Sequence, residues 1–283
     1  MSGSVIKLEN VSWAYSRAQD WALKNISMTI GEGEFIAVMG ENGAGKTTLC
    51  RLLNGLIPHS LAGKLMGTVT IDGVLTTSCT VARLAEKTGM AFEDPETQLF
   101  TARVSDEIAF ALENVLRPAG EIRERVRWAL DLAGLSAYAD YAPSMLSGGQ
   151  KQRLAIAAAL AMAETILALD EPASQLDPAG AREVLSFIRD LRDRTGLTVV
   201  MATNSGEEAA DFADRICVLK NGSLAALDSP QRIFADQRLL ADCAIAVPAV
   251  AEFACRMAAL GKPLPRFPVN LSEAEESVVK WYE

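Results

Sequence analysis

Short apolar segments separated by turn residues characterise the first seventy residues of the chain. Apolar runs of this kind, bounded by glycine and aspartate turns, predict β-strands. The predicted strands are Val5–Leu8, Ile26–Ile30, Phe35–Met39 and Gly67–Ile71, with turns at Gly31-Glu32-Gly33 and Asp72-Gly73. This part of the chain is therefore expected to be rich in β-structure.

From about residue 104 to residue 163 the spacing of apolar residues becomes helical. Pro118-Ala119-Gly120 separates two predicted helices, and a third is expected to begin near Ser147 and to extend over Lys151–Ala163. The residues that share one face of the first two helices are Val104, Ile108, Leu112 and Val115, followed by Ile122, Val126, Leu130 and Ala133.

Fully apolar runs alternate with helical patterns in the next part of the chain. Thr165–Leu169 and Leu197–Thr203 fit buried parallel strands. Asp177-Pro178 is a helix start, because an aspartate cap is followed by proline at the first helical position. The buried stripe of this helix is formed by Ala181, Leu185, Ile188 and Leu191. A hairpin with a tight turn at Asn221-Gly222 is predicted to join the strands Arg215–Lys220 and Ser223–Leu227. The alternation predicts an α/β fold with a parallel sheet, and the pattern weakens beyond about residue 236.

Composition narrows the range of functions. The 283 residues include 27 Lys and Arg against 36 Asp and Glu, which gives a net charge of -9. This acidic balance argues against nucleic acid as the main partner, because binding to phosphate backbones needs clustered basic residues. The only histidine, His59, excludes sites that need two or three imidazoles and makes a histidine-dependent triad improbable.

The cysteine pattern and the hydropathy of the chain indicate in which cellular compartment the protein is expected. The five cysteines are scattered without any C-x-x-C pair, so we interpret them as reduced, mostly buried thiols of a cytosolic protein, with metal ligands or disulfides as the alternative. The N-terminal residues lack an apolar run after a basic start, so no secretory signal is expected. The longest apolar stretch, residues 154–163, is far shorter than the roughly 20 residues of a membrane span. Any membrane role is therefore expected to be peripheral.

One segment has the spacing of a phosphate-binding loop, G-x-x-x-x-G-K-[ST], between a predicted strand and a predicted helix. Glycines let consecutive backbone N–H groups face the phosphates, and the helix N-terminus adds positive potential. Lys46 is expected to contact the β- and γ-phosphates, and the Thr47 hydroxyl to ligate Mg²⁺. The alternative is a glycine-rich turn. The expected ATP-binding residues here are Gly40, Glu41, Asn42, Gly43, Ala44, Gly45, Lys46, Thr47 and Thr48.

A second motif places two acids after the apolar strand that ends at Leu169. Asp170 is expected to hold the Mg²⁺ shell, and Glu171 to polarise an attacking water. Alone, such a pair is more often a solvated strand end. The phosphate loop earlier in the same chain favours a catalytic interpretation.

Leu146-Ser147-Gly148-Gly149-Gln150 precedes a predicted helix and, with the two motifs above, resembles the ATP-binding-cassette (ABC) ATPases. The resemblance implies a P-loop NTPase core with an antiparallel β-subdomain, a helical subdomain at about residues 96–163 and a head-to-tail dimer. In such a dimer Ser147, Gly148, Gly149 and Gln150 form the signature that caps the γ-phosphate held by the partner's loop. A Ser-Gly-Gly segment at a helix N-terminus is also an anion site on physical grounds, although a simple helix cap would explain it in isolation.

Two further positions match the family less specifically. Asp177, in Ser174-Gln175-Leu176-Asp177, resembles the loop that crosses the dimer interface. Tyr15 lies where the family stacks an aromatic ring on adenine. Because Trp13 and Tyr15 share a strand face, ordinary core packing is the alternative for this pair.

A narrower resemblance is to the energy-coupling-factor (ECF) branch of the family, whose ATPases drive uptake of vitamins and transition-metal ions. It rests on Asn54-Gly55-Leu56-Ile57-Pro58-His59, on Asp94-Pro95-Glu96-Thr97-Gln98-Leu99-Phe100 and on Asp106-Glu107-Ile108-Ala109-Phe110. The segment from Ser229 to about Ser277 is similar to that branch's small dimerising extension. We therefore divide the chain into a nucleotide-binding domain, residues 1–235, and a C-terminal extension, residues 236–283.

Two positions depart from the family. Glu93 stands where the family has a glutamine near Mg²⁺ and the water, and Asn204 stands where it has a histidine that contacts the γ-phosphate. Glu93 retains a hard oxygen ligand but brings negative charge toward a polyanion, and Asn204 is a shorter donor that cannot become cationic. Removing one well-placed donor costs on the order of 3 kcal/mol, so a weak hydrolytic site is expected, with harmless drift as the alternative.

The resemblance implies an ATP-hydrolysing subunit that uses ATP and Mg²⁺ at the cytoplasmic face of a membrane. Its partners would be a second ATPase subunit, a transmembrane scaffold and a substrate-binding membrane subunit, without nucleic acid. A different, fully equipped ATPase is the favoured partner, and a homodimer is the alternative. The helix Val104–Val115 and the Gln98 loop are expected to contact the scaffold, with subdomain core as the alternative role. The competing function is a regulatory subunit that binds ATP without turning it over.

Overall fold

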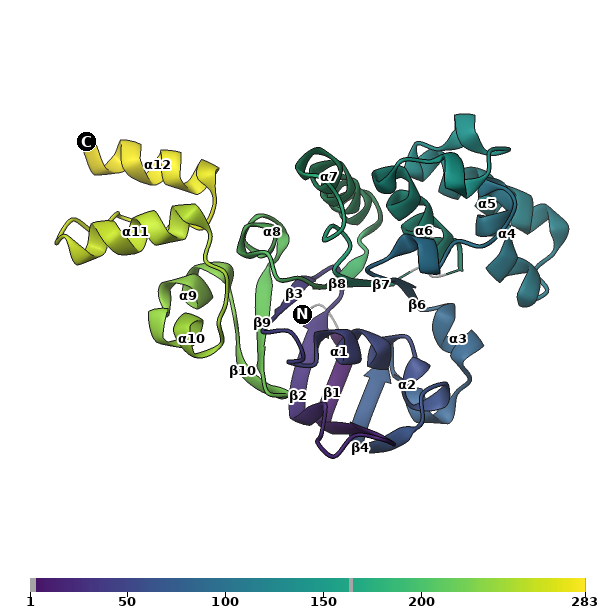
Figure 1. Cartoon of the computed structure of the whole chain (residues 1–283), viewed down its shortest axis with the longest axis horizontal. Coiled ribbons are helices and arrows are strands. Elements are labelled where there is room, and N and C mark those ends of the chain that lie inside the picture. Colours follow the sequence, from purple (N-terminus) through teal and green to yellow (C-terminus); the bar gives the residue numbers. More distant parts are fainter. Residues whose placement is uncertain (1–3, 163–164, 283) are drawn as a thin grey trace.

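The computed structural model describes residues 4–162 and 165–282, and in this part of the chain two sheets form the centre (Figure 1). The larger sheet has six strands in the order β10-β9-β3-β8-β7-β6, and all pair in parallel except β10 with β9. Its strands are β3 Phe35–Met39, β6 Thr88–Ala91, β7 Ile166–Asp170, β8 Thr198–Ala202, β9 Arg215–Lys220 and β10 Ser223–Asp228. The predicted parallel sheet and the Asn221-Gly222 hairpin are therefore confirmed.

The smaller sheet is antiparallel and has the order β2-β1-β4-β5 within the described residues. Its strands are β1 Ser4–Tyr15, β2 Leu23–Gly31, β4 Gly63–Ile71 and β5 Val74–Leu75. Helix α1, Lys46–Leu53, lies between the two sheets, because Leu49 and Leu52 share one buried cluster with Trp13 and Ile36. Short helices α2 and α3, Leu56–His59 and Val81–Ala85, follow on the same side.

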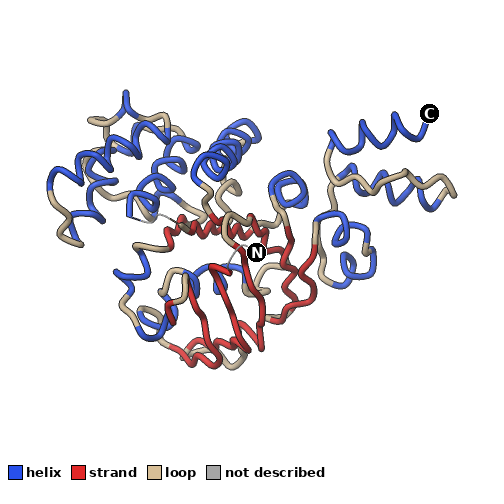
Figure 2. The backbone as a smooth tube through the Cα atoms, turned by 180° about the vertical axis from the view of Figure 1, so that it is seen from behind, coloured by secondary structure: helices blue, strands red, loops and turns tan. Residues whose placement is uncertain are grey.

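The opposite face of the larger sheet packs against helices (Figure 2). Helix α7, Pro178–Thr195, begins where the sequence predicts, because the Asp177 carboxylate accepts a hydrogen bond from the Gly180 N–H at 2.9 Å. Its residues Leu185 and Ile188 share a buried cluster with strands β7 and β8. Helix α8, Gly206–Phe212, covers the same face beside β3 and was not predicted from the sequence.

The helical subdomain has its own core. It contains α4 Val104–Asn114, α5 Ala119–Ala133 and α6 Gly148–Met162, with short 3-10 turns at Pro95–Thr97, Ser136–Tyr138 and Pro143–Met145. The predicted apolar stripes meet in one cluster, with the exception of Val115. One boundary differs, because α4 ends at Asn114 and leaves Val115 as the C-cap. The predicted extension of the third helix to Ala163 lies outside the described residues.

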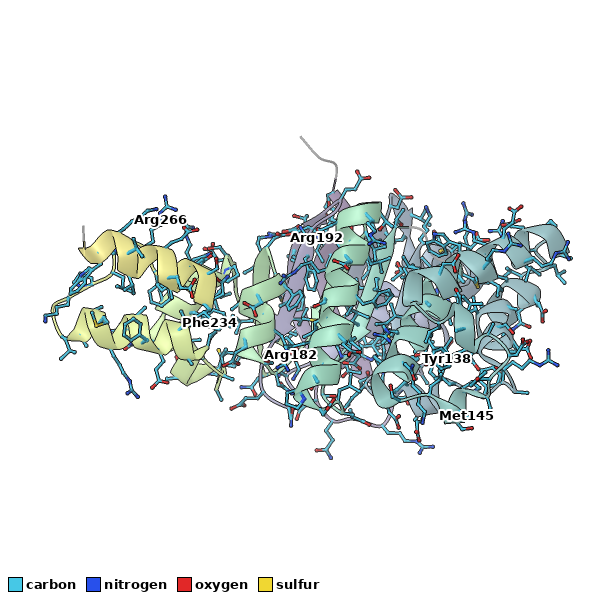
Figure 3. The ribbon with its side chains drawn as sticks, turned by 90° about the horizontal axis from the view of Figure 1, so that it is seen from above. Tyr138, Met145, Arg182, Arg192, Phe234 and Arg266 are labelled. Carbon is cyan, nitrogen blue, oxygen red and sulfur yellow. The ribbon has the colours of Figure 1, made fainter. Side chains whose placement is uncertain are left out.

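Four short helices end the chain: α9 Pro230–Ala235, α10 Gln237–Asp242, α11 Ala249–Ala259 and α12 Leu271–Tyr282. Figure 3 shows this segment, with Phe234 and Arg266, at the opposite end of the molecule from Tyr138 and Met145 of the helical subdomain. Phe234 and Ile245 share a buried cluster with Met39 and Ala209, so the C-terminal helices pack directly on strand β3 and helix α8.

Candidate functional site

The phosphate loop lies between the end of β3 and the start of α1, as the sequence predicts. Its glycines Gly40, Gly43 and Gly45 have φ values of 149°, 84° and 110°. A Cβ on Gly45 would lie 2.8 Å from the Ala22 carbonyl oxygen, and one on Gly40 would overlap the Leu219 carbonyl. Glycine is therefore favoured by the backbone conformation at all three positions, and required for space at Gly40 and Gly45.

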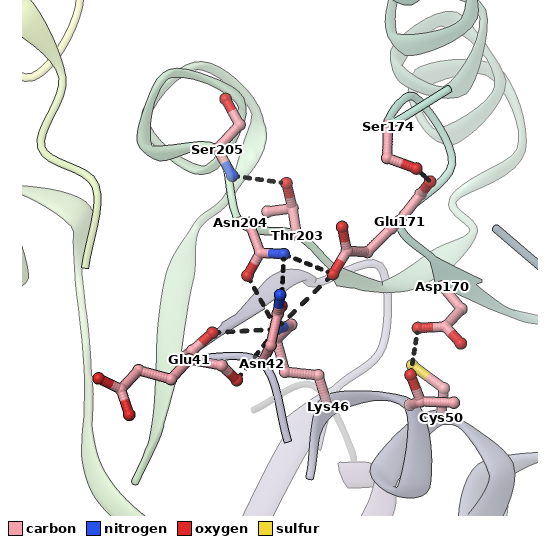
Figure 4. Close-up of polar contacts among 12 residues, drawn as sticks. Glu41, Asn42, Lys46, Cys50, Asp170, Glu171, Ser174, Thr203, Asn204 and Ser205 are labelled. Atoms are coloured by element: carbon pink, nitrogen blue, oxygen red, sulfur yellow. Dashed lines mark hydrogen bonds and ion pairs between the residues drawn. The ribbon is translucent and has the colours of Figure 1, made fainter. Parts of the chain in front are cut away.

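The Lys46 side chain is 5% exposed and turns back into this loop (Figure 4). Its ammonium donates hydrogen bonds to the Gly40 carbonyl at 2.9 Å and to the Asn204 side-chain oxygen at 2.8 Å. It also lies 3.6 Å from a carboxylate oxygen of Glu171. The lysine predicted to contact phosphates is thus next to the predicted catalytic acid.

Thr47, the second residue of α1, lies next to Asp170, the last residue of strand β7. The Thr47 hydroxyl donates to an Asp170 carboxylate oxygen at 2.9 Å. Both are hard oxygen donors of the type that Mg²⁺ prefers, so the pair fits the predicted metal site. Among the described residues no group of three His, Cys, Asp or Glu side chains is arranged to hold a metal. Phosphate oxygens and water would have to complete the shell, as in a Mg²⁺–ATP complex.

Burial perturbs both acids at the end of β7. Desolvation is the main cause that raises the pKa of Asp170, and the Thr47 hydrogen bond partly opposes it. Desolvation likewise raises the pKa of Glu171, while the Lys46 charge lowers it. Glu93 adds to the rise at both acids through its negative charge. The exposed Glu93 side chain therefore acts electrostatically on the site, and its predicted role as a Mg²⁺ ligand stays a prediction.

Glu171 itself has the left-handed φ of 48°, which is unusual for a residue with a side chain. Such backbone strain concentrates at functional sites, because the surrounding structure must hold it. Here the Ala202 carbonyl accepts the Glu171 backbone N–H at 2.9 Å, and the Ser174 hydroxyl donates to the Glu171 carbonyl at 3.0 Å. These bonds fix the direction in which the carboxylate leaves the strand.

Asn204 is the central residue of this polar cluster. Its side-chain oxygen accepts from Lys46, and its amide donates to Glu171 at 2.7 Å and to the Asn42 side-chain oxygen at 3.3 Å. The sequence predicts only a short neutral donor at this position. The link between Lys46 and Glu171 could not have been found from the sequence, because it depends on the distance between three separate loops.

The segment that carries Asn204, residues 203–206, is called the β8–α8 loop below. Within it, the Thr203 hydroxyl donates to the Glu208 carboxylate at 2.6 Å and accepts from the Ser205 N–H at 3.0 Å. The Ser205 hydroxyl accepts from the Glu208 N–H and caps α8. These hydrogen bonds all lie within residues 203–208, and they restrict the conformation of the loop.

The predicted signature is at the start of α6. The Gln150 N–H donates to the Ser147 hydroxyl at 3.3 Å and the Ser147 N–H donates to the Gln150 side chain at 2.9 Å, which is a reciprocal capping box. A Cβ on Gly148 would lie 3.1 Å from the Leu176 side chain. The structure therefore brings the signature next to the predicted dimer loop, whose Asp177 caps α7.

Tyr15 ends strand β1 beside the phosphate-loop helix. Its hydroxyl lies 3.1 Å from the Thr48 hydroxyl, and its ring packs edge-on against Trp13 at 5.6 Å between centroids. Trp13 is fully buried, so the core interpretation is confirmed for that residue. The half-buried Tyr15 remains the predicted adenine contact.

The cysteines and the histidine are not part of the hydrogen-bonded cluster around Asn204. All five cysteines are free thiols, as predicted; Cys50, Cys217 and Cys243 are buried. Burial raises the pKa of Cys217 to about 12. A ring nitrogen of His59 lies 2.8 Å from the Thr76 carbonyl oxygen, a structural contact.

The chain is similar in sequence to known ATP-binding proteins. A family model described as ABC transporter matches residues 23–174. A putative ABC transporter ATP-binding protein of Pyrococcus abyssi is 40% identical over 245 residues, 87% of this chain and 88% of the relative. The energy-coupling factor transporter ATP-binding protein EcfA1 of Lacticaseibacillus paracasei is 40% identical over 265 residues, 93% of each chain.

Two solved structures are also similar. CbiO1 of Clostridium perfringens, described as part of the ABC transporter complex CbiONQ, has a TM-score of 0.74 and 31% identity, and the match covers 91% of this chain and 97% of that one. A dimer of the ATP-binding cassette MJ0796 bound to ADP and Pi has a TM-score of 0.68 and 30% identity, covering 80% and 98%. Within the described residues, the helices are all too short or too polar to cross a membrane.

Proposed function

Because the chain belongs to the ABC transporter family of ATPases, we propose that it is an ATP-hydrolysing subunit that energises an ECF-type membrane importer. The observation that carries this proposal is the cluster in which Lys46, Asn204 and Glu171 meet beside the Thr47–Asp170 pair. The EcfA1 and CbiO1 names of two similar proteins support the importer class. We further propose a vitamin or a transition-metal ion as the cargo, and a peripheral position at the cytoplasmic face of the membrane.

The residues have distinct roles in the proposed reaction. The N–H groups of the phosphate loop bind the phosphates, with Lys46 on the β- and γ-phosphates. Thr47 and Asp170 would hold Mg²⁺, which would supply Lewis-acid polarisation of the phosphoryl oxygens. Glu171 orients the attacking water, and its neighbour Lys46 keeps a positive charge close to that carboxylate.

The second half of each ATP site comes from another ATPase subunit in the proposed assembly. Ser147, Gly148 and Gly149 would contact the γ-phosphate held by the partner, and Asp177 would lie at the interface. The capping box at Ser147 and Gln150 supports this role because it fixes the direction of the α6 N-terminus. The contact between Gly148 and Leu176 supports a shared interface for both segments.

An exposed aromatic pair marks the proposed contact surface for the membrane scaffold. Phe100 is 66% exposed and Phe110 is 41% exposed, and their rings pack edge-on at 4.7 Å. The Gln98 side chain anchors the preceding loop through the Phe92 N–H at 3.3 Å and the Met90 carbonyl at 3.3 Å. The loop is thereby tied to strand β6, next to Glu93, so a scaffold helix on this surface would be close to the ATP site.

The C-terminal extension is the proposed dimerising element. Exposed apolar side chains on α11 and α12 include Phe253 and Val279, with Leu260 directly after α11. Apolar groups of this size at a surface favour contact with another protein. This extension would then reinforce a dimer that the ATP sites open and close.

We also propose that the chain's own site is weak. Asn204 cannot become cationic, and Glu93 adds negative charge where a polyanion must bind. A partner ATPase with a complete site would then carry most of the turnover, so a mixed dimer is favoured over a homodimer. The competing proposal is a regulatory subunit that binds ATP without hydrolysing it, and it rests on the same two residues.

Affinity isolation from detergent-solubilised membranes tests the importer assignment. The wild-type chain should retain a multispan scaffold protein, a substrate-binding membrane subunit and a second ATPase, identified by mass spectrometry. The double variant Phe100→Ala and Phe110→Ala should lose the membrane proteins and keep the ATPase. Met66→Ala, which removes an exposed apolar side chain from strand β4, is the matched control. Retention of the scaffold by the double variant would overturn the proposed surface.

A further inference from the structure

A segment of the C-terminal extension passes directly beside the catalytic cluster. Residues 244–248, called the strap below, connect α10 to α11. A cavity of about 340 Å³ has Gly40–Asn42 and Asn204 on one side and Ala244–Ala246 on the other. The strap is therefore the part of the extension that faces the phosphate loop.

The strap is in contact with the β8–α8 loop at Gly206. A Cβ placed on Gly206 would overlap the Ala246 carbonyl oxygen and would lie 3.0 Å from the Pro248 ring. No side chain fits there, so the first residue of α8 and the strap backbone are packed without free space. Asn204 is two residues earlier in the same loop.

The strap has a fixed shape of its own. Ala244 has a left-handed φ of 46°, and the Ile245 N–H donates to the Leu240 carbonyl at 3.0 Å. The Ile245 side chain is 7% exposed and packs in the cluster that contains Met39 and Ala209. Pro248 is the N-cap of α11, so a displacement of α11 would move the strap first.

We propose that the strap positions the β8–α8 loop, and through it Asn204, relative to Lys46 and Glu171. Gly206 and Ala246 act on the reaction only through Asn204, so they are positioning residues. The C-terminal extension would then set the geometry of the ATP site of its own chain. This inference concerns the ATPase reaction and does not depend on which transporter the chain serves.

The variant Gly206→Ala tests the proposal because its methyl group forces the strap and the loop apart. Single-turnover hydrolysis should fall about tenfold, because an error of about 1 Å in the position of a catalytic group can cost more than that. The Kd for ATP should stay unchanged, since the phosphate loop is intact. Amide hydrogen exchange should accelerate in residues 203–206 and 244–247, but not in residues 40–46.

Gly120→Ala is the matched control, because a Cβ on Gly120 meets nothing within 4 Å. Ala246→Gly provides a second variant that introduces no clash and only loosens the strap. It should accelerate exchange in the β8–α8 loop and lower the hydrolysis rate less than Gly206→Ala does. If Gly206→Ala and Ala246→Gly both fold and leave exchange in residues 203–206 at the level of Gly120→Ala, the proposal is wrong.

Discussion

The molecule has two proposed surfaces for ATP, and they depart to different degrees from the pattern that the sequence resemblance implies. The phosphate-loop side, Gly40–Thr48 with Asp170 and Glu171, carries two unusual residues, Glu93 and Asn204. The signature side, Ser147–Gln150 with Asp177, retains its pattern and its helix cap. In the proposed head-to-tail dimer the first side would serve this chain's own ATP, whereas the second would serve the partner's.

The two sides also differ in how their polar groups are engaged. On the phosphate-loop side, Asn204 holds Lys46 and Glu171 together through hydrogen bonds of 2.8 and 2.7 Å. On the signature side, Ser147 and Gln150 hydrogen-bond to each other within one helix N-terminus. We therefore expect that this chain can lose efficiency at its own site and still complete its partner's site.

The largest effect is expected for Glu171→Gln on the phosphate-loop side. Loss of the general base should lower phosphate release at saturating ATP by about 100-fold or more. ATP binding should persist, because the loop and Lys46 are unchanged. Glu275→Gln, an exposed substitution on α12, is the control. Unchanged phosphate release in Glu171→Gln would favour the ATP-binding regulatory subunit over the enzyme.

On the signature side, Gly149→Ala should act only across the interface. The chain itself has room for the methyl group, so folding should be unaffected. In a mixed dimer we expect about tenfold slower hydrolysis at the partner's loop, since the methyl group separates a donor from the γ-phosphate. Binding of ATP to this chain's own loop should be unchanged, and Gly120→Ala should have neither effect. If Gly149→Ala weakened the ATP site of this chain as much as that of its partner, the proposed division between the phosphate-loop side and the signature side would be wrong.

A smaller effect concerns the support of Asn204. Burial raises the pKa of Glu208, with smaller contributions from the charges of Glu171 and Glu207, while the Thr203 hydrogen bond lowers it. The folded chain thus binds this proton more tightly than the unfolded chain does. The corresponding stability is present at low pH and is lost as pH rises through the raised pKa.

Glu208→Gln should remove this loss, because the glutamine amide does not ionise. Its side-chain oxygen can still accept the Thr203 hydrogen bond, so the loop keeps that contact. Chemical denaturation at a series of pH values should show a flatter decline of the unfolding free energy above pH ~4.5 than in the wild type. Glu275→Gln should follow the wild-type curve. Parallel curves for Glu208→Gln and wild type would show that burial of this carboxyl has no energetic consequence.

The sequence predicted the elements whose residues carry a strong local signal. Phe35–Met39 and Ile166–Asp170 are apolar runs that end in polar motifs, and Asp177-Pro178 is a strong helix start. The sequence did not predict helices α2, α3 and α8–α12. Most of these have only four to seven residues, and the longer α11 and α12 lie in a segment that several prolines interrupt. Local pattern also cannot give distances between loops. The bonds from Asn204 to Lys46, Glu171 and Asn42, and the contact of Gly206 with the strap, therefore appear only in the structure.

Replacing Glu93 by glutamine and Asn204 by histidine tests most directly whether these two residues weaken the chain's own ATP site. The measurement is the rate of phosphate release by the purified chain at saturating ATP, in wild type and in the double variant Glu93→Gln and Asn204→His. We predict slow release by the wild type and an increase of about tenfold or more in the double variant, because each restored donor stabilises the transition state. A brisk wild-type rate that the double variant leaves unchanged would contradict this account.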